Sequence, residues 1–253
     1  MHRFYLPFEQ WSDPVCTLKN EEAHHAVQVL RLGAGDKIVV MDGAGRHCTC
    51  EIITASRAEL RAQVVARAFA PPPSCRITLV QAIPKGKLME SIVQKSTELG
   101  VARVVPLLSD RVATRLEAAE RREKASKWQQ VAVEAIKQSG AVWLPHIEIP
   151  VTLREFLQRE ERFDLNLLGS LQPDSQHPRT YFDAYFEQHQ KLPASLALWI
   201  GPEGDFTLAE IMETRRAGAL PFTMGPLVLR VETAAITALA IASSELRVQR
   251  PAA

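Results

Sequence analysis

The chain has 253 residues, of which 46% are hydrophobic and 23% are charged, and its formal net charge is +1. These values are typical of a globular protein, so they exclude a largely disordered chain and leave the binding of an anionic partner to local charge. The N-terminal sequence HRFYLPFEQWSDP lacks the apolar core of a signal peptide, and the longest apolar stretch, 234–242, is about half as long as a membrane-spanning helix. We therefore expect a cytoplasmic protein.

The N-terminal part, residues 1–73, predicts a small β-rich domain. Residues 42–45 separate two β-branched runs and predict a hairpin turn, and residues 60–69 alternate in the manner of a strand. One helix interrupts the strands, and Asn20 is its expected N-cap. The polar side of this helix forms either a solvated face or an RNA-docking surface, and it carries His24, His25, Gln28 and Arg31.

The cysteines are Cys16, Cys48, Cys50 and Cys75, and no two of them form a Cys-x-x-Cys pair. Cys48 and Cys50 are two residues apart, so they would share one face of a strand. We interpret the cysteines as reduced thiols of a cytoplasmic protein and predict no metal site.

Consecutive prolines at 71–73, followed by Ser74, predict an extended linker and place a domain boundary between residues 73 and 74. Beyond the linker, strand-like and helix-like segments alternate. Such alternation predicts an α/β domain, 74–253, with a mainly parallel sheet that helices cover on both faces. Strands are expected at 76–83, 101–108, 146–149, 165–168, 196–200 and 222–224, and helices at 85–99, 117–139, 153–160, 181–190, after Thr207 and after Thr233.

Two glycine turns near the C-terminus predict a ligand crevice. The first, Gly201-Pro202-Glu203-Gly204, follows the apolar run LALWI, and the second, Gly225-Pro226, follows the short strand at 222–224. Turns at neighbouring carboxyl ends of an open α/β sheet form such crevices. Thr207 with Glu210 predicts a capping box that starts the helix after the first turn.

Charged residues near these turns are candidates for binding and chemistry. Arg230 and Glu232 lie between the second turn and an Ala-rich helix that Thr233 could cap, where they either orient a substrate or form an ion pair that holds the turn. Lys85 and Lys87 follow the first strand of the α/β domain, where positive charge beside helix amides suits a phosphate; a solvated lysine pair is the alternative.

Several segments closely resemble one known family in order along nearly the whole chain. They are HHAVQVLRL, KGKLMESIVQKSTELGV, WQQVAVEAIKQSG, LWIGPEGDFTLAEI and MGPLVLRVETAAITAL. Together they resemble the ribosomal RNA small-subunit methyltransferase E family of the SPOUT superfamily. The resemblance implies a PUA-like β-barrel domain that binds RNA at 1–73 and a SPOUT domain with a deep trefoil knot at 74–253. It also implies a homodimer that transfers a methyl group from S-adenosylmethionine to N3 of one uridine in the 16S ribosomal RNA of the small subunit.

The resemblance carries roles over to particular residues. Arg230 would orient the uracil or stabilise charge on its carbonyl oxygens, and Glu232 would accept the N3 proton or hold Arg230. The chain departs from the family pattern at Ala141 and Leu227, where arginine is usual, and at Asp205, where glycine is usual. The cofactor pocket would use Leu168, Gly169, Gly201, Pro202, Glu203, Gly204, Met224, Gly225, Leu227 and Leu229, and RNA contacts would come from His25, Arg31, Lys85, Lys87 and Arg111.

Two other functions are compatible with the sequence. One is a non-catalytic RNA-binding factor for ribosome assembly that has the same fold. The other is a small-molecule α/β enzyme, for which residues 1–73 would have no evident role.

Overall fold

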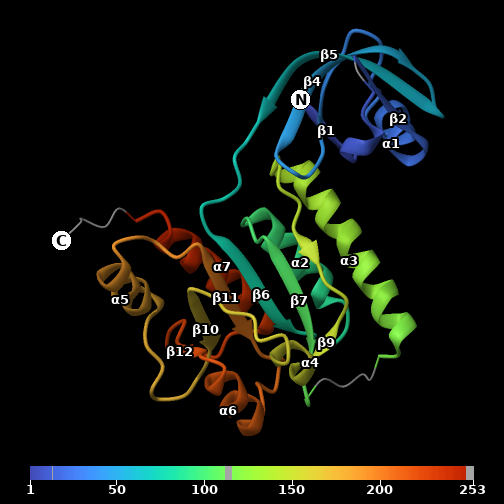
Figure 1. Cartoon of the computed structure of the whole chain (residues 1–253). Helices are drawn as coiled ribbons and strands as arrows, with labels where there is room; N and C mark the ends of the chain where they lie inside the picture. Colours follow the sequence, from blue (N-terminus) through green and yellow to red (C-terminus); the bar gives the residue numbers. More distant parts are fainter. Residues whose placement is uncertain (13, 112–115, 249–253) are drawn as a thin grey trace. The chain divides into compact units, whose positions relative to one another are not determined.

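The computed structural model describes residues 1–12, 14–111 and 116–248, which divide into two compact units (Figure 1). The first unit comprises Met1–Pro72 and Val133–Leu144, and the second comprises Pro73–Ala132 and Pro145–Ala253. The segment Val133–Leu144 therefore packs with the N-terminal unit, although the sequence places it beyond the proline linker. Among the described residues, the helices are too short or too polar to cross a membrane.

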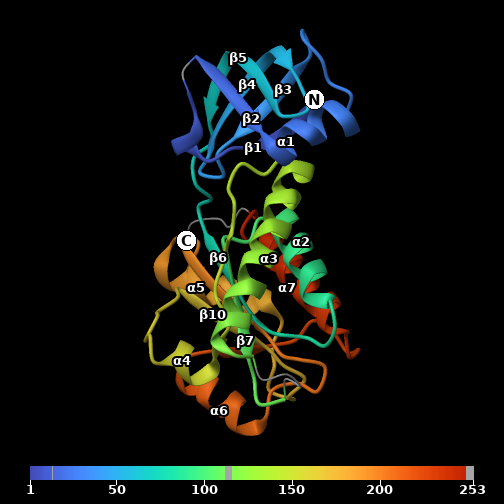
Figure 2. The same cartoon turned by 90° about the vertical axis from the view of Figure 1, so that its right-hand side faces the viewer.

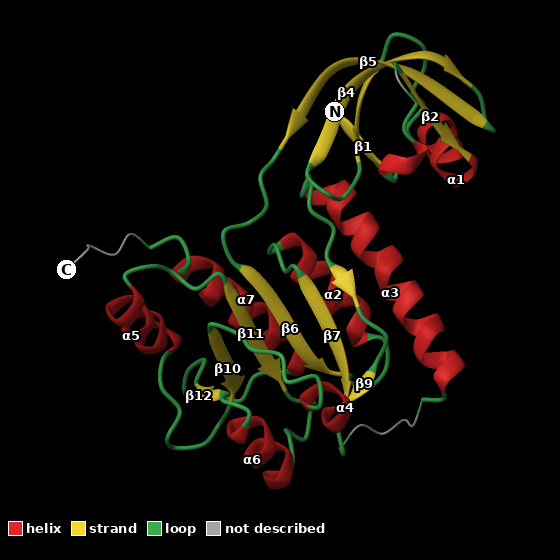
Figure 3. Cartoon of the chain, viewed as in Figure 1, coloured by secondary structure: helices red, strands yellow, loops and turns green. Residues whose placement is uncertain are grey.

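The first unit is built on a five-stranded sheet with the order β1-β3-β4-β5-β2 (Figure 3). β1 pairs with β3 in parallel, and the other neighbours are antiparallel. β1 and β2 form the two edges, so the curled sheet remains an open half-barrel. The strands are β1 (His2–Tyr5), β2 (Val15–Lys19), β3 (Lys37–Met41), β4 (Arg46–Ala55) and β5 (Glu59–Phe69).

The predicted hairpin at residues 42–45 is confirmed, because it joins the antiparallel strands β3 and β4. Asp42 Oδ1 accepts hydrogen bonds from the backbone N–H groups of Ala44, at 2.7 Å, and Arg46, at 3.0 Å. The Asp42 side chain thus takes the place of backbone acceptors inside the turn, as aspartates commonly do.

The helical part of the first unit differs from the prediction. It consists of a short 3-10 helix, Phe8–Gln10, then α1 (Asn20–His24) and a π-helical turn, His25–Val29. Asn20 is not the N-cap; it is the first residue of α1 with φ +52°, and Lys19 precedes it without a side-chain cap. Asparagine tolerates this left-handed conformation, and the Asn20 N–H donates to the Ala58 carbonyl at 3.2 Å. The chain uses Asn20 to turn from β2 into the helix.

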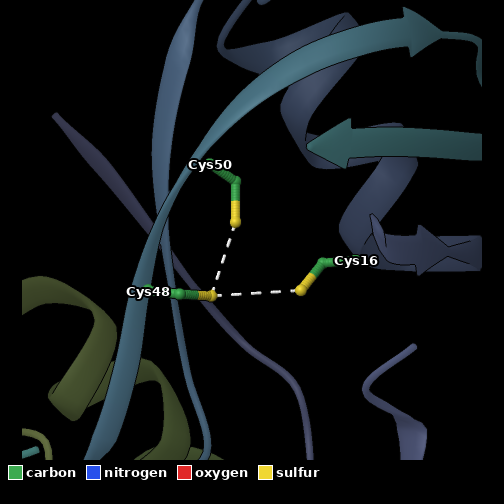
Figure 4. Close-up of side chains that lie close together, drawn as sticks. All are labelled: Cys16, Cys48 and Cys50. Atoms are coloured by element: carbon green, nitrogen blue, oxygen red, sulfur yellow. Dashed lines mark hydrogen bonds between the residues drawn. The ribbon is translucent and has the colours of Figure 1, made fainter. Parts of the chain in front are cut away.

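Three cysteines meet inside the half-barrel (Figure 4). Cys16 Sγ lies 3.9 Å from Cys48 Sγ, which lies 3.4 Å from Cys50 Sγ, and all three are buried thiols rather than disulfides. The hydrogen bond with Cys16, together with burial, raises the pKa of Cys48 to about 12, and hydrogen bonds to the other thiols and burial also raise the pKa of Cys50. In this environment the three side chains pack as small apolar groups in the core of the half-barrel.

The second unit contains a seven-stranded parallel sheet, which confirms the predicted α/β class (Figure 1). Its order is β12-β10-β11-β6-β7-β8, and β9 also pairs with β7. The central strands are buried on both faces, as expected when helices cover both sides. The strands are β6 (Arg76–Ala82), β7 (Arg103–Leu108), β8 (His146–Ile147), β9 (Val151–Thr152), β10 (Leu165–Gly169), β11 (Ser195–Ile200) and β12 (Leu220–Phe222).

Helices pack on both faces of this sheet (Figure 2). On one face, Phe156 of α4 packs edge-on against Trp199 of β11 with ring centroids 5.2 Å apart, and Ile211 of α6 belongs to the same core. Away from this core, α7 contacts β11, α2 and α5. The trefoil knot stays a prediction. The helices are α2 (Leu88–Glu98), α3 (Ala118–Ser139), α4 (Leu153–Leu157), α5 (Pro178–His189), α6 (Leu208–Arg216) and α7 (Val231–Glu245).

Candidate active site at the carboxyl edge of the sheet

A cavity of about 490 Å³ lies at the carboxyl ends of β10, β11 and β12, which are neighbours in the sheet. The loops after these strands form its walls, and the start of α7 closes one side. Parallel strands place their carboxyl ends at one edge of the sheet, so segments between residues 169 and 234 meet here. The two glycine turns in the sequence predicted a crevice at this place. The lining residues are Leu88, Gly169, Ser170, Leu171, Ile200, Gly201, Pro202, Glu203, Asp205, Met224, Gly225, Leu227, Val228, Leu229, Arg230, Val231, Glu232 and Ala234.

Two glycines in the cavity wall are packed so closely that a Cβ at either position would force its neighbours to move. A Cβ on Gly201 would lie 2.9 Å from Asp205 Oδ1 and 3.2 Å from the Phe206 nitrogen. A Cβ on Gly169 would lie 3.2 Å from the Trp199 carbonyl oxygen and from Ile200 Cδ1. These turns therefore bring bare backbone to the cavity surface, where its N–H and C=O groups can face a ligand.

Asp205 holds the end of the first glycine turn. It has φ +60°, a conformation that glycine adopts most easily, and its Oδ1 accepts from the Phe206 N–H at 2.7 Å. Its own N–H donates to the Pro202 carbonyl at 2.9 Å, which closes the turn. The structure thus explains how an aspartate is accommodated at this point of the turn, because its side chain bonds locally in a left-handed conformation.

α6 begins directly after this turn with the predicted capping box, which is confirmed. Thr207 accepts a hydrogen bond from the Glu210 N–H, and the Glu210 carboxylate accepts from the Thr207 N–H at 2.8 Å. Glu210 Oε1 also accepts from the Asp110 N–H at 2.8 Å. The buried carboxylate of Glu210 therefore connects the loop after β7 to the start of α6.

The second turn differs from the sequence prediction in two details. β12 spans Leu220–Phe222 and ends two residues before the predicted strand end. α7 begins at Val231 with Arg230 as N-cap and no side-chain cap, so the predicted cap at Thr233 is wrong. Thr233 lies inside the helix, and the helix starts earlier because the chain leaves the turn immediately after Leu229. Gly225 has φ +119°, which requires glycine at that point of the turn.

Arg230 and Glu232 both line the cavity, at the N-cap and in the first turn of α7. Arg230 is exposed and Glu232 is half-buried. Within the described residues, no ion pair joins the two side chains, so the structure gives no support to the alternative in which they only hold the turn. Both groups are placed to face a molecule in the cavity.

Most of the residues predicted for the cofactor lie in the cavity wall, but two do not line it. Leu168 is fully buried in β10, and Gly204, whose carbonyl accepts a hydrogen bond from Arg111 Nη1, is not among the lining residues. Sequence reasoning did not select Leu88, because it is more than a hundred positions distant from the glycine turns. Asp205 was selected only as a departure from the family pattern.

The residues predicted to bind RNA fall in both units. Lys85, Lys87 and Arg111 lie in the loops after β6 and β7, and the Lys85 N–H donates to Glu203 Oε1 at 2.9 Å. His25, in the first unit, is half-buried and packs edge-on against Phe4, whereas Arg31 is exposed with φ +56°.

Comparison with known proteins defines the class to which this fold and cavity belong. The family described as "RNA methyltransferase domain" matches residues 71–243, and the family described as "RNA methyltransferase PUA domain" matches residues 18–65. The cavity walls lie within the first match and the half-barrel strands β3 and β4 within the second. The class is therefore an RNA methyltransferase domain joined to a PUA domain.

Individual relatives make the assignment more specific. The ribosomal RNA small subunit methyltransferase E of Synechocystis sp. is 33% identical over 94% of this chain and 76% of its own length. The protein of the same name from Bacillus subtilis is 28% identical over 94% of this chain and 93% of its own length. The chain belongs to the ribosomal RNA small subunit methyltransferase E family, which confirms the resemblance found in the sequence.

Solved structures agree with this assignment. A Legionella pneumophila protein described as a methyltransferase in complex with the cofactor SAM has a TM-score of 0.84 and 32% identity, with 96% of each chain covered. The ribosomal RNA small subunit methyltransferase E of Neisseria gonorrhoeae, bound to S-adenosylmethionine, has a TM-score of 0.81 and 26% identity over 96% of this chain and 97% of its own.

Proposed function

We propose that this protein transfers a methyl group from S-adenosylmethionine to N3 of a uridine in the 16S ribosomal RNA of the small subunit. The observation that carries the proposal is the cavity at the carboxyl edge, with its glycine walls and with Arg230 and Glu232 at one side. Membership of the methyltransferase E family supports the same reaction. The protein would act in the cytoplasm, where ribosomal RNA is processed.

The cavity fits S-adenosylmethionine. Its volume of about 490 Å³ is within the range of roughly 300–1,000 Å³ typical of small-ligand sites. Gly169 and Gly201 place bare, closely packed backbone in the cavity wall, and Met224, Leu227 and Leu229 give the cavity apolar walls suited to an adenine ring. The relatives from Legionella pneumophila and Neisseria gonorrhoeae were solved with this cofactor bound, which supports the assignment. Leu168 and Gly204 do not line the cavity and would support the residues that contact the cofactor.

The cofactor, when bound, supplies an electrophilic methyl group on a sulfonium sulfur. The protein's residues then have to align uracil N3 with that methyl group, so that the N–C bond would form as the methyl–sulfur bond breaks and its electron pair stays on sulfur, while the N3 proton passes to a base. In this proposal Arg230 orients the uracil and stabilises negative charge on its carbonyl oxygens. Glu232 accepts the proton or holds the Arg230 guanidinium in position.

RNA would be held by both parts of the chain. Residues 1–73 would form the RNA-binding domain, with His25 and Arg31 as contacts, and residues 74–253 would form the methyl-transfer domain. Lys85, Lys87 and Arg111 would contact RNA beside the cavity. Because a base inside a stacked helix cannot reach the cavity, the target uridine would be unpaired or turned out of its stack.

The proposal includes a homodimer with a knotted methyl-transfer domain. Leu227 and Val228, in the cavity wall, are 73% and 79% exposed, and a second subunit would cover these apolar side chains. The alanines of α7 do not all serve such an interface, because Ala235, Ala238 and Ala242 are buried within the chain. β12 lies beside β10 although β11 comes between them in sequence, so the chain crosses over at this edge.

The alternative of a non-catalytic assembly factor is less well supported, because the glycine cradle would then have no ligand. The test combines titration calorimetry with S-adenosylmethionine and a transfer assay with radiolabelled cofactor on small subunits from cells that lack the protein. We expect cofactor binding and one labelled uridine, identified as N3-methyluridine by mass mapping of 16S ribosomal RNA. A folded protein that binds the cofactor but labels no RNA would favour the assembly factor.

A further inference from the structure

A second cavity, of about 480 Å³, lies at the same sheet edge as the candidate active site. The loops after β6 and β7, with α3, form its walls, and β6 is the sheet neighbour of β11. Apolar side chains line its floor, among them Met89 and Trp128, which are both nearly fully buried. The second cavity is therefore preformed in the fold, next to the cofactor cavity.

Positive charge dominates the lining of this second cavity. Among the described residues, two carboxylates line it: Glu90, which pairs with Lys127 at 2.7 Å, and Glu203, which accepts from the Lys85 backbone N–H. The hydrogen bond from Lys127 lowers the pKa of Glu90, so this carboxylate is ionised and neutralises one cation. The remaining cations outnumber the carboxylates, and the cationic lining residues are Lys85, Lys87, Arg111, Lys124 and Lys127.

The two cavities share one wall. Glu203 lines both of them, and its loop is held from the basic side by the Lys85 N–H and by Arg111, which donates to the Gly204 carbonyl. A polyanion bound in the basic cavity would therefore be separated from the cofactor cavity by a single residue, Glu203. Positively charged side chains that gather in a groove beside a reaction site favour the binding of a polyanion that must enter that site.

We propose that this basic cavity binds the phosphodiester backbone of the RNA beside the target uridine, with Glu203 as the partition between RNA and cofactor. The inference rests on the proposed function and deepens it, because it assigns Lys124 and Lys127, on α3, to substrate binding. Lysines that contact phosphates hold an RNA in register without reading its sequence. The cavity thus positions the nucleotide that enters the cofactor site.

The test uses the full-length protein with the double substitution Lys87→Gln and Lys124→Gln. Both side chains are exposed, and the structure describes no ion pair for either, so the fold should be unaffected. The matched control, Lys191→Gln with Arg216→Gln, removes two exposed positive charges elsewhere on the same unit. Filter binding of a 16S ribosomal RNA transcript is measured over a salt series without cofactor, and S-adenosylmethionine binding is measured separately by calorimetry.

We expect the double variant to bind RNA about ten-fold more weakly, with a salt slope reduced by about one to two, because each lost phosphate contact removes roughly 0.7–1 from the slope. Its cofactor affinity and the RNA affinity of the control should match the wild type. An unchanged RNA affinity and salt slope would overturn the proposal, and so would an equal loss in the control. Because RNA binding is measured without methyl transfer, a wild-type protein that binds RNA but fails to methylate it would count against the proposed function alone.

Discussion

Glu203 accepts a hydrogen bond from the backbone N–H of Lys85, with Oε1 and the nitrogen 2.9 Å apart. The two residues are 118 positions apart, and the bond ties the loop after β6 to the glycine turn after β11. Because Glu203 lines both cavities at the sheet edge, this contact fixes the wall that separates them. Cofactor binding and RNA binding are therefore expected to depend on the same loop.

Gly201 and Gly204 belong to the same turn but should respond differently to alanine. A Cβ at Gly201 would lie 2.9 Å from Asp205 Oδ1, whereas a Cβ at Gly204 would meet first the flexible Arg111 side chain at 3.4 Å. We expect Gly201→Ala to weaken S-adenosylmethionine binding by at least about ten-fold, roughly 1.4 kcal/mol. Gly204→Ala is the matched control and should bind normally in calorimetry. Equal affinity of the two variants would mean that the cofactor does not lie against this turn.

Arg230 should be needed for methyl transfer rather than for cofactor binding. Its side chain is exposed at the cavity edge and no ion pair is described for it, so Arg230→Ala should leave the fold and the cofactor Kd unchanged. We expect kcat to fall by about a hundred-fold or more, because loss of a group that stabilises developing charge costs roughly 2.7–4 kcal/mol. Arg230→Lys should recover part of the rate in a single-turnover assay. Normal turnover of Arg230→Ala would remove this residue from the mechanism.

Asp205 should tolerate replacement by glycine but not by valine. At φ +60° glycine is unstrained, which offsets the loss of the hydrogen bond to the Phe206 N–H. We expect Asp205→Gly to change the free energy of unfolding by less than about 1 kcal/mol. Asp205→Val should destabilise the protein by about 1–3 kcal/mol, because a β-branched residue is strained in this conformation. Urea unfolding of both variants checks this order, and a valine variant as stable as the wild type would contradict it.

Glu210 should contribute more to stability than an ordinary capping residue. Its carboxylate is 4% exposed and accepts from the Thr207 and Asp110 backbone N–H groups, both at 2.8 Å. We expect Glu210→Ala to cost about 2–4 kcal/mol, since it leaves donors unsatisfied, and Thr207→Ala to cost about 1 kcal/mol. The exposed Glu213, on the same helix, provides the control, and Glu213→Ala should stay within about 0.5 kcal/mol of the wild type. Denaturant midpoints that reverse this order would refute the role given to Glu210.

The sequence predicted those features that local chemistry determines. The hairpin at residues 42–45, the capping box at Thr207 and the alternation of strands and helices follow from turn residues and apolar periodicity. The predictions that Asn20 and Thr233 are N-caps are wrong. Asn20 is already the first residue of α1, and α7 already begins at Val231, before Thr233. Local patterns also contain no information about strand order.

The same limit applies to the candidate site. The glycine turns and Arg230 could be found in the sequence, because unusual backbone requires particular residue types. The basic cavity could not, since Lys124 and Lys127 lie on a helix where acidic neighbours suggest ordinary surface ion pairs. Only the fold brings that helix next to the loop after β6 and to Glu203.

Cys75 should make the protein less stable in alkali. The thiol is 6% exposed, and burial, with a smaller contribution from the charge of Asp164, raises its pKa from 9.0 to about 12. Between pH 9 and 12 the unfolded chain loses this proton while the folded protein keeps it, so the stability that is complete below pH 9 decreases as the pH rises. The loss approaches about 1.4 kcal/mol per pH unit for one such group.

Removal of the Cys75 thiol tests this dependence directly. Cys75→Ala should be less stable than the wild type at pH 7, because a buried side chain is shortened, yet its stability should decline less steeply above pH 9. Urea unfolding at several pH values from 8 to 10.5 in the presence of reductant measures both slopes. The exposed Ser74 supplies the control, since Ser74→Ala should leave the pH dependence unchanged. Parallel slopes for wild type and Cys75→Ala would show that this thiol ionises in the folded protein as readily as in the unfolded chain.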